Sequence, residues 1–101
     1  MAKLKALSKK DVVKGLAGLE GWRLSKEALR CEFRFESFKK ALQFVNTVAG
    51  MAEAANHHPD IDIRYSLVKL ALSTHDVGGI SKKDFQFARA VDQLSSVRKS
   101  V

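Results

Sequence analysis

The chain has 101 residues, of which 46% are hydrophobic and 29% are charged, and its formal net charge is +7. This length suits one domain with a single core, and this balance is typical of a folded globular protein rather than a disordered one. The composition therefore predicts a single domain over residues 1–101.

Cysteine content and hydropathy point to a cytoplasmic protein. Cys31 is the one cysteine in the chain, so an internal disulfide is excluded and a reducing compartment is favoured. No apolar run approaches the roughly 20 residues that span a bilayer. The first residues, Met1 to Lys5, lack the apolar region of a signal peptide.

The positive charge raises the possibility of a nucleic-acid partner. Residues 1–30 hold eight Lys and Arg against three Asp and Glu, whereas residues 31–101 hold ten against eight. There is no Gly/Arg tract, zinc-finger spacing or aromatic RNA-binding motif. A solvated basic surface is therefore favoured, and a dedicated nucleic-acid reader is the less favoured alternative.

The first third of the chain predicts a helix and two strands. Ser8 and Asp11 resemble a capping box that opens a helix extending to about residue 19, after which Gly18 and Gly21 break the pattern. A strand is expected over 22–25 and a turn over 26–28. The next strand has alternating apolar and charged residues, with Leu29, Cys31, Phe33 and Phe35 on one face and Arg30, Glu32, Arg34 and Glu36 on the other. Such alternation indicates an antiparallel sheet that is covered on one side.

The rest of the chain predicts a second helix followed by two strands, and then a third helix. Ser37 is expected to cap a helix through about residue 55, whose apolar stripe consists of Phe38, Ala41, Leu42, Val45, Val48, Ala49 and Ala52. Strands are expected over 60–65 and 67–72, joined near Ser66 by a tight hairpin or by a bulge. After the Gly78-Gly79 turn, Ser81 and Asp84 form a capping-box pattern for a helix over about 82–97. We therefore expect an α+β fold of two layers, a four-stranded antiparallel sheet with helices packed on one face, in the order α-β-β-α-β-β-α.

Three histidines are the main candidates for chemistry. His57 and His58 lie where the long helix gives way to a strand, and His75 follows the last strand. If these two strands pair as a hairpin, all three imidazoles can meet at one edge of the sheet. Imidazole titrates near neutral pH, so such a cluster suits general acid/base catalysis. Each histidine could instead cap a helix end, and a zinc site is a further alternative, although HExxH and CxxC motifs are absent.

Other residues are open to two interpretations. Cys31 lies on the apolar face of its strand, where a buried small side chain is favoured over a nucleophile. Glu53 precedes His57 by one helical turn and could orient a histidine or be an ordinary exposed residue. Trp22 and Tyr65 could belong to the core or to the wall of a pocket.

The run AEAANHHPDIDIRYSLVKLALSTHDVGGISKKD closely resembles the pterin-4a-carbinolamine dehydratase family. The spacing that the family shares is met, without adjustment, by Glu53, His57, His58, Pro59, Tyr65, His75 and Asp84. Gly21-Trp22 and the stretch CEFRFESFKKALQFVNTVAGMAE are also similar, so that the resemblance covers roughly residues 8–96. Ile61 departs from the family, many members of which have Trp at this position.

The resemblance implies a hydro-lyase that converts 4a-hydroxytetrahydropterin, such as the biopterin form, to quinonoid dihydropterin and water. His57 and His75 match the histidines that transfer protons, one on each face of the pterin. His58 matches a histidine that helps to hold the pterin and can assist as a base, and Glu53 matches the acidic residue that supports the pair. The implied substrate-binding residues are Ser73 and Thr74, through main-chain groups, together with Trp22 and Pro59. No metal and no organic cofactor is implied.

The resemblance also implies partners. Recycling of the pterin would serve an aromatic amino-acid hydroxylase, and the family forms homodimers and homotetramers that protect exposed sheet edges. Two rival functions are a binding module, such as a dimerisation partner of a transcription factor or an assembly factor, and a protein of another pterin pathway. Assembly-type relatives tend to lack parts of the histidine set, so its completeness here favours the enzyme.

Overall fold

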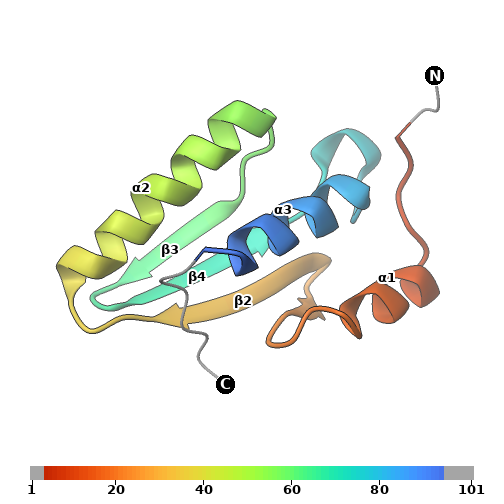
Figure 1. The fold of residues 1–101 in the computed structure, drawn as a ribbon. Helices are drawn as coiled ribbons and strands as arrows, with labels where there is room; N and C mark the ends of the chain where they lie inside the picture. The colour runs from red at the N-terminus through yellow and green to blue at the C-terminus, as the bar shows by residue number, and fades with distance from the viewer. Residues whose placement is uncertain (1–3, 95–101) are drawn as a thin grey trace.

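The computed structural model describes residues 4–94, and its elements follow the predicted order (Figure 1). They are α1 (Lys9–Leu16), β1 (Arg23–Ser25), β2 (Ala28–Arg34), α2 (Phe38–Ala55), β3 (Asp60–Arg64), β4 (Leu67–Leu72), the 3₁₀ turn η1 (His75–Val77) and α3 (Lys82–Asp92). The strands form one antiparallel sheet in the order β1-β2-β4-β3. Figure 1 shows α2 and α3 over the same face of this sheet, and α1 near the start of β2. The predicted two-layer α+β fold is therefore confirmed.

The two faces of the sheet follow from the alternation along β2. Leu29, Cys31 and Phe33 are fully buried, because they face the helices. The residues between them point to the opposite face, where Arg30 lies beside Ala71 and Glu32 beside Lys69 in the paired strand. Because the helix-free face carries charged side chains, it tolerates contact with water, as expected for an antiparallel sheet covered on one side.

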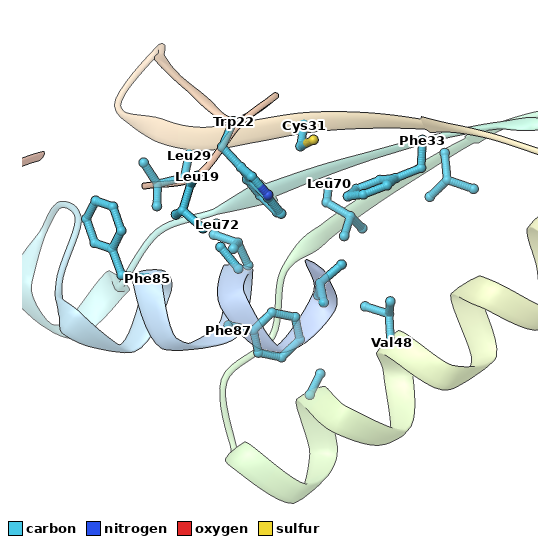
Figure 2. Packing of buried hydrophobic residues seen from close by; sticks show 14 of the residues in the cluster. Leu19, Trp22, Leu29, Cys31, Phe33, Val48, Leu70, Leu72, Phe85 and Phe87 are labelled. Carbon is cyan, nitrogen blue, oxygen red and sulfur yellow. The ribbon is translucent and has the colours of Figure 1, made fainter. Parts of the chain in front are cut away.

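The core fills the space between the sheet and the two long helices (Figure 2). Phe33 is central, with its ring centroid 4.9 Å from that of Phe44 on α2 and 5.9 Å from that of Trp22. From α3, Phe85 and Phe87 enter the same cluster. Aromatic contacts of this geometry add to the stabilisation from apolar burial, and they hold α2 and α3 against the sheet.

The apolar stripe of α2 differs from the prediction at three positions. Ala41, Val48 and Ala52 are buried as expected, but Phe38 is 46% exposed and Ala49 also faces solvent. Phe44, which was not assigned to the stripe, is buried in the core. Phe38 is the first residue of the helix, beyond the part that crosses the sheet, so its predicted burial was wrong.

Both hairpins are tight two-residue turns. Lys26 and Glu27 between β1 and β2 have φ angles of 50° and 62°, the left-handed conformation that type I′ turns require. Tyr65 and Ser66 connect β3 to β4, because Arg64 pairs directly with Leu67, so the hairpin is correct and the bulge is not. Tyr65 has a φ of 55°, is 74% exposed and stacks on Phe38, so it belongs neither to the core nor to a pocket wall.

The helix ends are set by local hydrogen bonds. Helix α1 begins as predicted, with Ser8 Oγ accepting from the Asp11 N–H, but it ends at Leu16 and continues as short turns towards Trp22. The full capping box between Ser81 and Asp84 is present at the start of α3. The last three residues predicted for that helix, 95–97, lie outside the described residues. None of the helices in residues 4–94 has the length and apolar character needed to cross a membrane.

Candidate functional site

The end of α2 separates the two adjacent histidines. Asn56 adopts the left-handed conformation (φ 49°, ψ 44°) and closes the helix, with its N–H directed at the carbonyls of Ala52 and Glu53. The His57 N–H then donates to the Ala52 carbonyl at 3.0 Å. This is a common way to end a helix, and Asn tolerates the left-handed conformation better than most residues. The reversal leaves His57 buried and His58 exposed.

His57 is held by a buried carboxylate. Its Nε2 lies 2.6 Å from Oδ1 of Asp84, and the Asp84 side chain is fully buried. The other carboxylate oxygen accepts hydrogen bonds from the Thr74 hydroxyl at 2.8 Å and from the Ser81 N–H at 2.9 Å. Thr74 Oγ1 also lies 2.7 Å from Ser81 Oγ. Because both oxygens have partners, the buried carboxylate is stabilised, which is the condition for retaining a charge inside a protein.

His58 forms a second histidine–carboxylate pair, at the surface. Its Nε2 lies 2.5 Å from Oε2 of Glu53, and the two side chains are 58% and 77% exposed. The sequence placed Glu53 one helical turn before His57, but the left-handed Asn56 ends the helix before that turn is completed. Glu53 therefore contacts His58, and the carboxylate next to His57 is Asp84.

His75 joins the other two histidines through the pairing of β3 with β4. Asp60 pairs with Ala71, so the start of β3 lies beside the end of β4, as expected for a hairpin. A hollow of about 310 Å³ opens at this edge, and its lining includes His57, His58 and His75. We call it the histidine hollow. His75 is exposed at the start of η1 and, within residues 4–94, its ring has no hydrogen-bond partner.

Of the four expected substrate-binding residues, three line the histidine hollow: Pro59, Ser73 and Thr74. The main-chain groups of Thr74 are already engaged, because its N–H donates to the Gly79 carbonyl and its carbonyl accepts from the N–H groups of Val77 and Gly79. Its hydroxyl is bonded to Asp84. Thr74 is therefore a buried residue that supports the wall of the hollow. Ser73, the preceding residue, is half-buried in the same wall.

Trp22 does not reach the histidine hollow. It directly precedes β1, which is the edge strand farthest from β3 in the sheet. Its indole is 5% exposed, points from the sheet towards α3 (Figure 2), and donates from Nε1 to Asp92 Oδ1 at 3.0 Å. The structure therefore places Trp22 in the core, the first of the two interpretations that the sequence left open.

Asp84, Asp60 and Lys83 are site residues to which the sequence assigned no role in the site. Asp84 was noted as a capping residue and as part of the shared spacing, but its contact with His57 joins positions 27 residues apart. Asp60 and Lys83 line the histidine hollow. Asp60 follows His58 by two residues, whereas Lys83 and Asp84 come close to the site because the start of α3 lies beside it, a contact that local spacing does not indicate.

The geometry suits proton transfer. If Nε2 of His57 carries the proton donated to Asp84, its Nδ1 is left as an acceptor, and the nearby carboxylate stabilises the imidazolium that forms when Nδ1 takes up a proton. The centroid of the Phe87 ring lies 6.3 Å from that of the imidazole. Within residues 4–94, no three His, Cys, Asp and Glu side chains come together to hold a metal ion. Three imidazoles, groups that can donate or accept protons near neutral pH, are thus part of the lining of one hollow.

Comparisons with known proteins agree with this fold and with the family that the sequence resembles. The family model described as pterin 4 alpha carbinolamine dehydratase matches residues 5–94. A protein of Chloroflexus aurantiacus, provisionally named a pterin-4-alpha-carbinolamine dehydratase, is 48% identical over 88 residues, which cover 87% of this chain and 95% of that protein. A protein of Aquifex aeolicus with the same provisional name is 37% identical over 91 residues, covering 90% and 92% of the two chains.

A solved structure from Brucella melitensis has the same fold. It is described as a transcriptional coactivator/pterin dehydratase and superposes with a TM-score of 0.83 at 30% sequence identity. The match covers 87% of this chain and 96% of that one.

Proposed function

The chain belongs to the pterin 4 alpha carbinolamine dehydratase family, and on this basis we propose that it dehydrates 4a-hydroxytetrahydropterin to quinonoid dihydropterin. The observation that carries the proposal is the gathering of His57, His58 and His75 around one hollow, with Asp84 buried behind His57.

The reaction breaks the C4a–O bond of the substrate and removes the proton on N5, so that a C4a=N5 double bond and one molecule of water form. Hydroxide is a poor leaving group, and the step therefore needs an acid at the oxygen and a base at N5. A well-placed pair contributes on the order of 10²–10⁴-fold to such a rate. His57 and His75 are the proposed pair, because they enter the hollow from different elements.

The remaining residues have supporting roles in this proposal. His58, held by Glu53, contacts the pterin ring and assists as a second base. Ser73 and Pro59 contribute to the wall that the ring lies against. Asp84 orients His57 and is a positioning residue, because it is fully buried and does not reach the hollow itself.

The proposal is tested by measuring the dehydration of 4a-hydroxytetrahydropterin with the purified protein. We expect a rate well above the uncatalysed reaction, and a loss of about 100-fold or more in kcat for both His57→Ala and His75→Ala. His58→Ala should retain more activity than either. The absence of any acceleration by the unmodified protein would refute the enzymatic function.

A binding function is the second candidate, and the name of the Brucella melitensis neighbour favours it. On this chain, Phe38 and Tyr65 form an exposed stacked pair, with ring centroids 6.4 Å apart, that could contribute to a protein contact. Co-purification of a stoichiometric protein partner, combined with an inactive enzyme assay, would favour this function over catalysis.

We also propose that the protein is a cytoplasmic homo-oligomer. Among the described residues 4–94, strand β3 has a neighbouring strand on one side only, and Ile63 on this edge is 38% exposed. Antiparallel pairing of β3 with a second copy, centred on Asp62, would place Asp60 opposite Arg64 of that copy, an attractive charge pair. Sedimentation as a monomer at micromolar concentration would contradict this proposal.

A further inference from the structure

A neighbouring hollow of about 290 Å³ lies beside the histidine hollow. The two have Asp60, Ser73, Thr74 and His75 in common among their lining residues, so they are adjacent, and a ligand that reaches across these four residues would contact both. We call this neighbouring hollow the second hollow. Its far end, away from the shared residues, is formed by Lys26 in the β1–β2 turn and by Arg30 on β2.

Two cations at this far end lack a carboxylate partner among residues 4–94. The Arg30 Nε donates to the Ser25 carbonyl at 2.8 Å, which anchors the guanidinium at the rim. Lys26 is exposed in the turn. Arg23 and Lys69 differ from them, because both lie within 4 Å of Glu32. A guanidinium held in place, together with a nearby ammonium, is a common arrangement for binding phosphate or carboxylate groups.

The charges are ordered along the two hollows. Asp60, Ala71 and Arg30 lie in one row across β3, β4 and β2. Two strand spacings separate the ends of this row, on the order of 10 Å between backbones. The side chain of Ala71 between them is small, and all three residues also line a further hollow on the same face of the sheet. Because Asp60 stands at the histidine end, a negative group on a ligand is favoured at the Arg30 end and disfavoured near the histidines.

We propose, building on the dehydratase function above, that the second hollow binds a negatively charged substituent of the pterin substrate. Lys26 and Arg30 contact a phosphate or a carboxylate on this substituent, while the pterin ring occupies the histidine hollow. Glu27, which follows Lys26 in the same turn and lines the same hollow, weakens this contact by its own negative charge.

The test compares three ligands that share a reduced pterin ring, namely dihydroneopterin, dihydroneopterin phosphate and dihydrofolate. Calorimetric titration gives the Kd of each, and the dehydration assay with the corresponding carbinolamines separates KM from kcat. We expect one or both of the anionic ligands to bind more tightly than neutral dihydroneopterin. Tighter binding of the phosphate or of dihydrofolate identifies which negative group the second hollow prefers.

Two variants in the exposed β1–β2 turn are expected to change the affinity for an anionic ligand in opposite directions. Lys26→Gln should weaken binding of the preferred anionic ligand about 2- to 5-fold, as expected for an exposed charge pair, and Glu27→Gln should strengthen it by a similar factor. Arg30→Gln should weaken it about 10-fold or more. None of these changes should alter the Kd of dihydroneopterin. Lys39→Gln, an exposed change at the opposite end of α2, is the control and should have no effect on any ligand.

The outcomes separate this proposal from the one on which it rests. If dihydroneopterin binds and its carbinolamine is dehydrated, but the anionic ligands bind no more tightly and do not respond to the three variants, the role of the second hollow is wrong and the dehydratase function stands. If no carbinolamine is dehydrated, the dehydratase function fails. Should Arg30→Gln fail to fold, the opposite shifts of Lys26→Gln and Glu27→Gln still decide the question.

Discussion

Two histidine–carboxylate pairs lie next to each other in this protein, and they differ in burial rather than in geometry. His57 and Asp84 approach to 2.6 Å, and His58 and Glu53 approach to 2.5 Å. The first pair is 10% and 0% exposed, whereas the second is 58% and 77% exposed. Water competes for the second pair and salt screens it, while the first is shielded from both.

The comparison shows that the same contact has different consequences in the two environments. Asp84 accepts hydrogen bonds from Thr74 and Ser81 as well as from His57, so its loss would leave several buried donors without an acceptor. Glu53 lies on the surface, where water can replace it. We therefore expect the buried pair to govern both stability and the orientation of His57, and the exposed pair to affect the site without holding the fold together.

The largest expected effect is that of Asp84→Ala. Removal of the carboxylate leaves His57, Thr74 and the Ser81 N–H without an acceptor, and the free energy of unfolding should fall by about 3–5 kcal/mol. Urea denaturation followed by circular dichroism measures this loss. Asp84→Asn keeps the shape and one acceptor, and should cost less. A loss below about 1 kcal/mol for the alanine variant would show that the buried network is not an important source of stability.

A smaller effect is expected for Thr74→Val. This change keeps the shape of the side chain but removes the hydroxyl that bonds to Asp84 and Ser81, and should cost about 1–2 kcal/mol in the free energy of unfolding. Thr47→Val is a matched control, because its hydroxyl bonds to a carbonyl on the exposed face of α2. Equal effects of the two changes would contradict the importance that we assign to burial.

The smallest effect on stability is expected for Glu53→Gln. An exposed pair contributes about 0.2–1 kcal/mol, and a double-mutant cycle with His58→Gln should return a coupling energy in this range. The coupling should decline between 0.05 M and 1 M salt, because the Debye length falls to roughly 3 Å at 1 M. A coupling above about 2 kcal/mol, unchanged by salt, would show that this pair behaves like the buried one.

The sequence predicted the order of elements because each rests on local patterns. The alternation along 29–36 and the capping box at Ser81 both appear in the structure. The predicted burial of Phe38 was wrong, and the spacing of Glu53 from His57 did not indicate that its histidine partner is His58, for related reasons. Helical spacing assigns a residue to a face, but it does not say how far the helix overlaps the sheet, nor where a left-handed residue such as Asn56 ends it.

What the sequence determined by itself was the α+β architecture, the three histidines and the family that their spacing resembles. These depend on short-range patterns, which a linear chain displays directly. Only the tertiary structure decided that Asp84 is the partner of His57, that Trp22 lies in the core, and that the second hollow lies beside the histidine hollow. Each of these depends on contacts between elements far apart in the chain. Strand order and helix packing bring such residues together, and the local spacing of residues does not show these contacts.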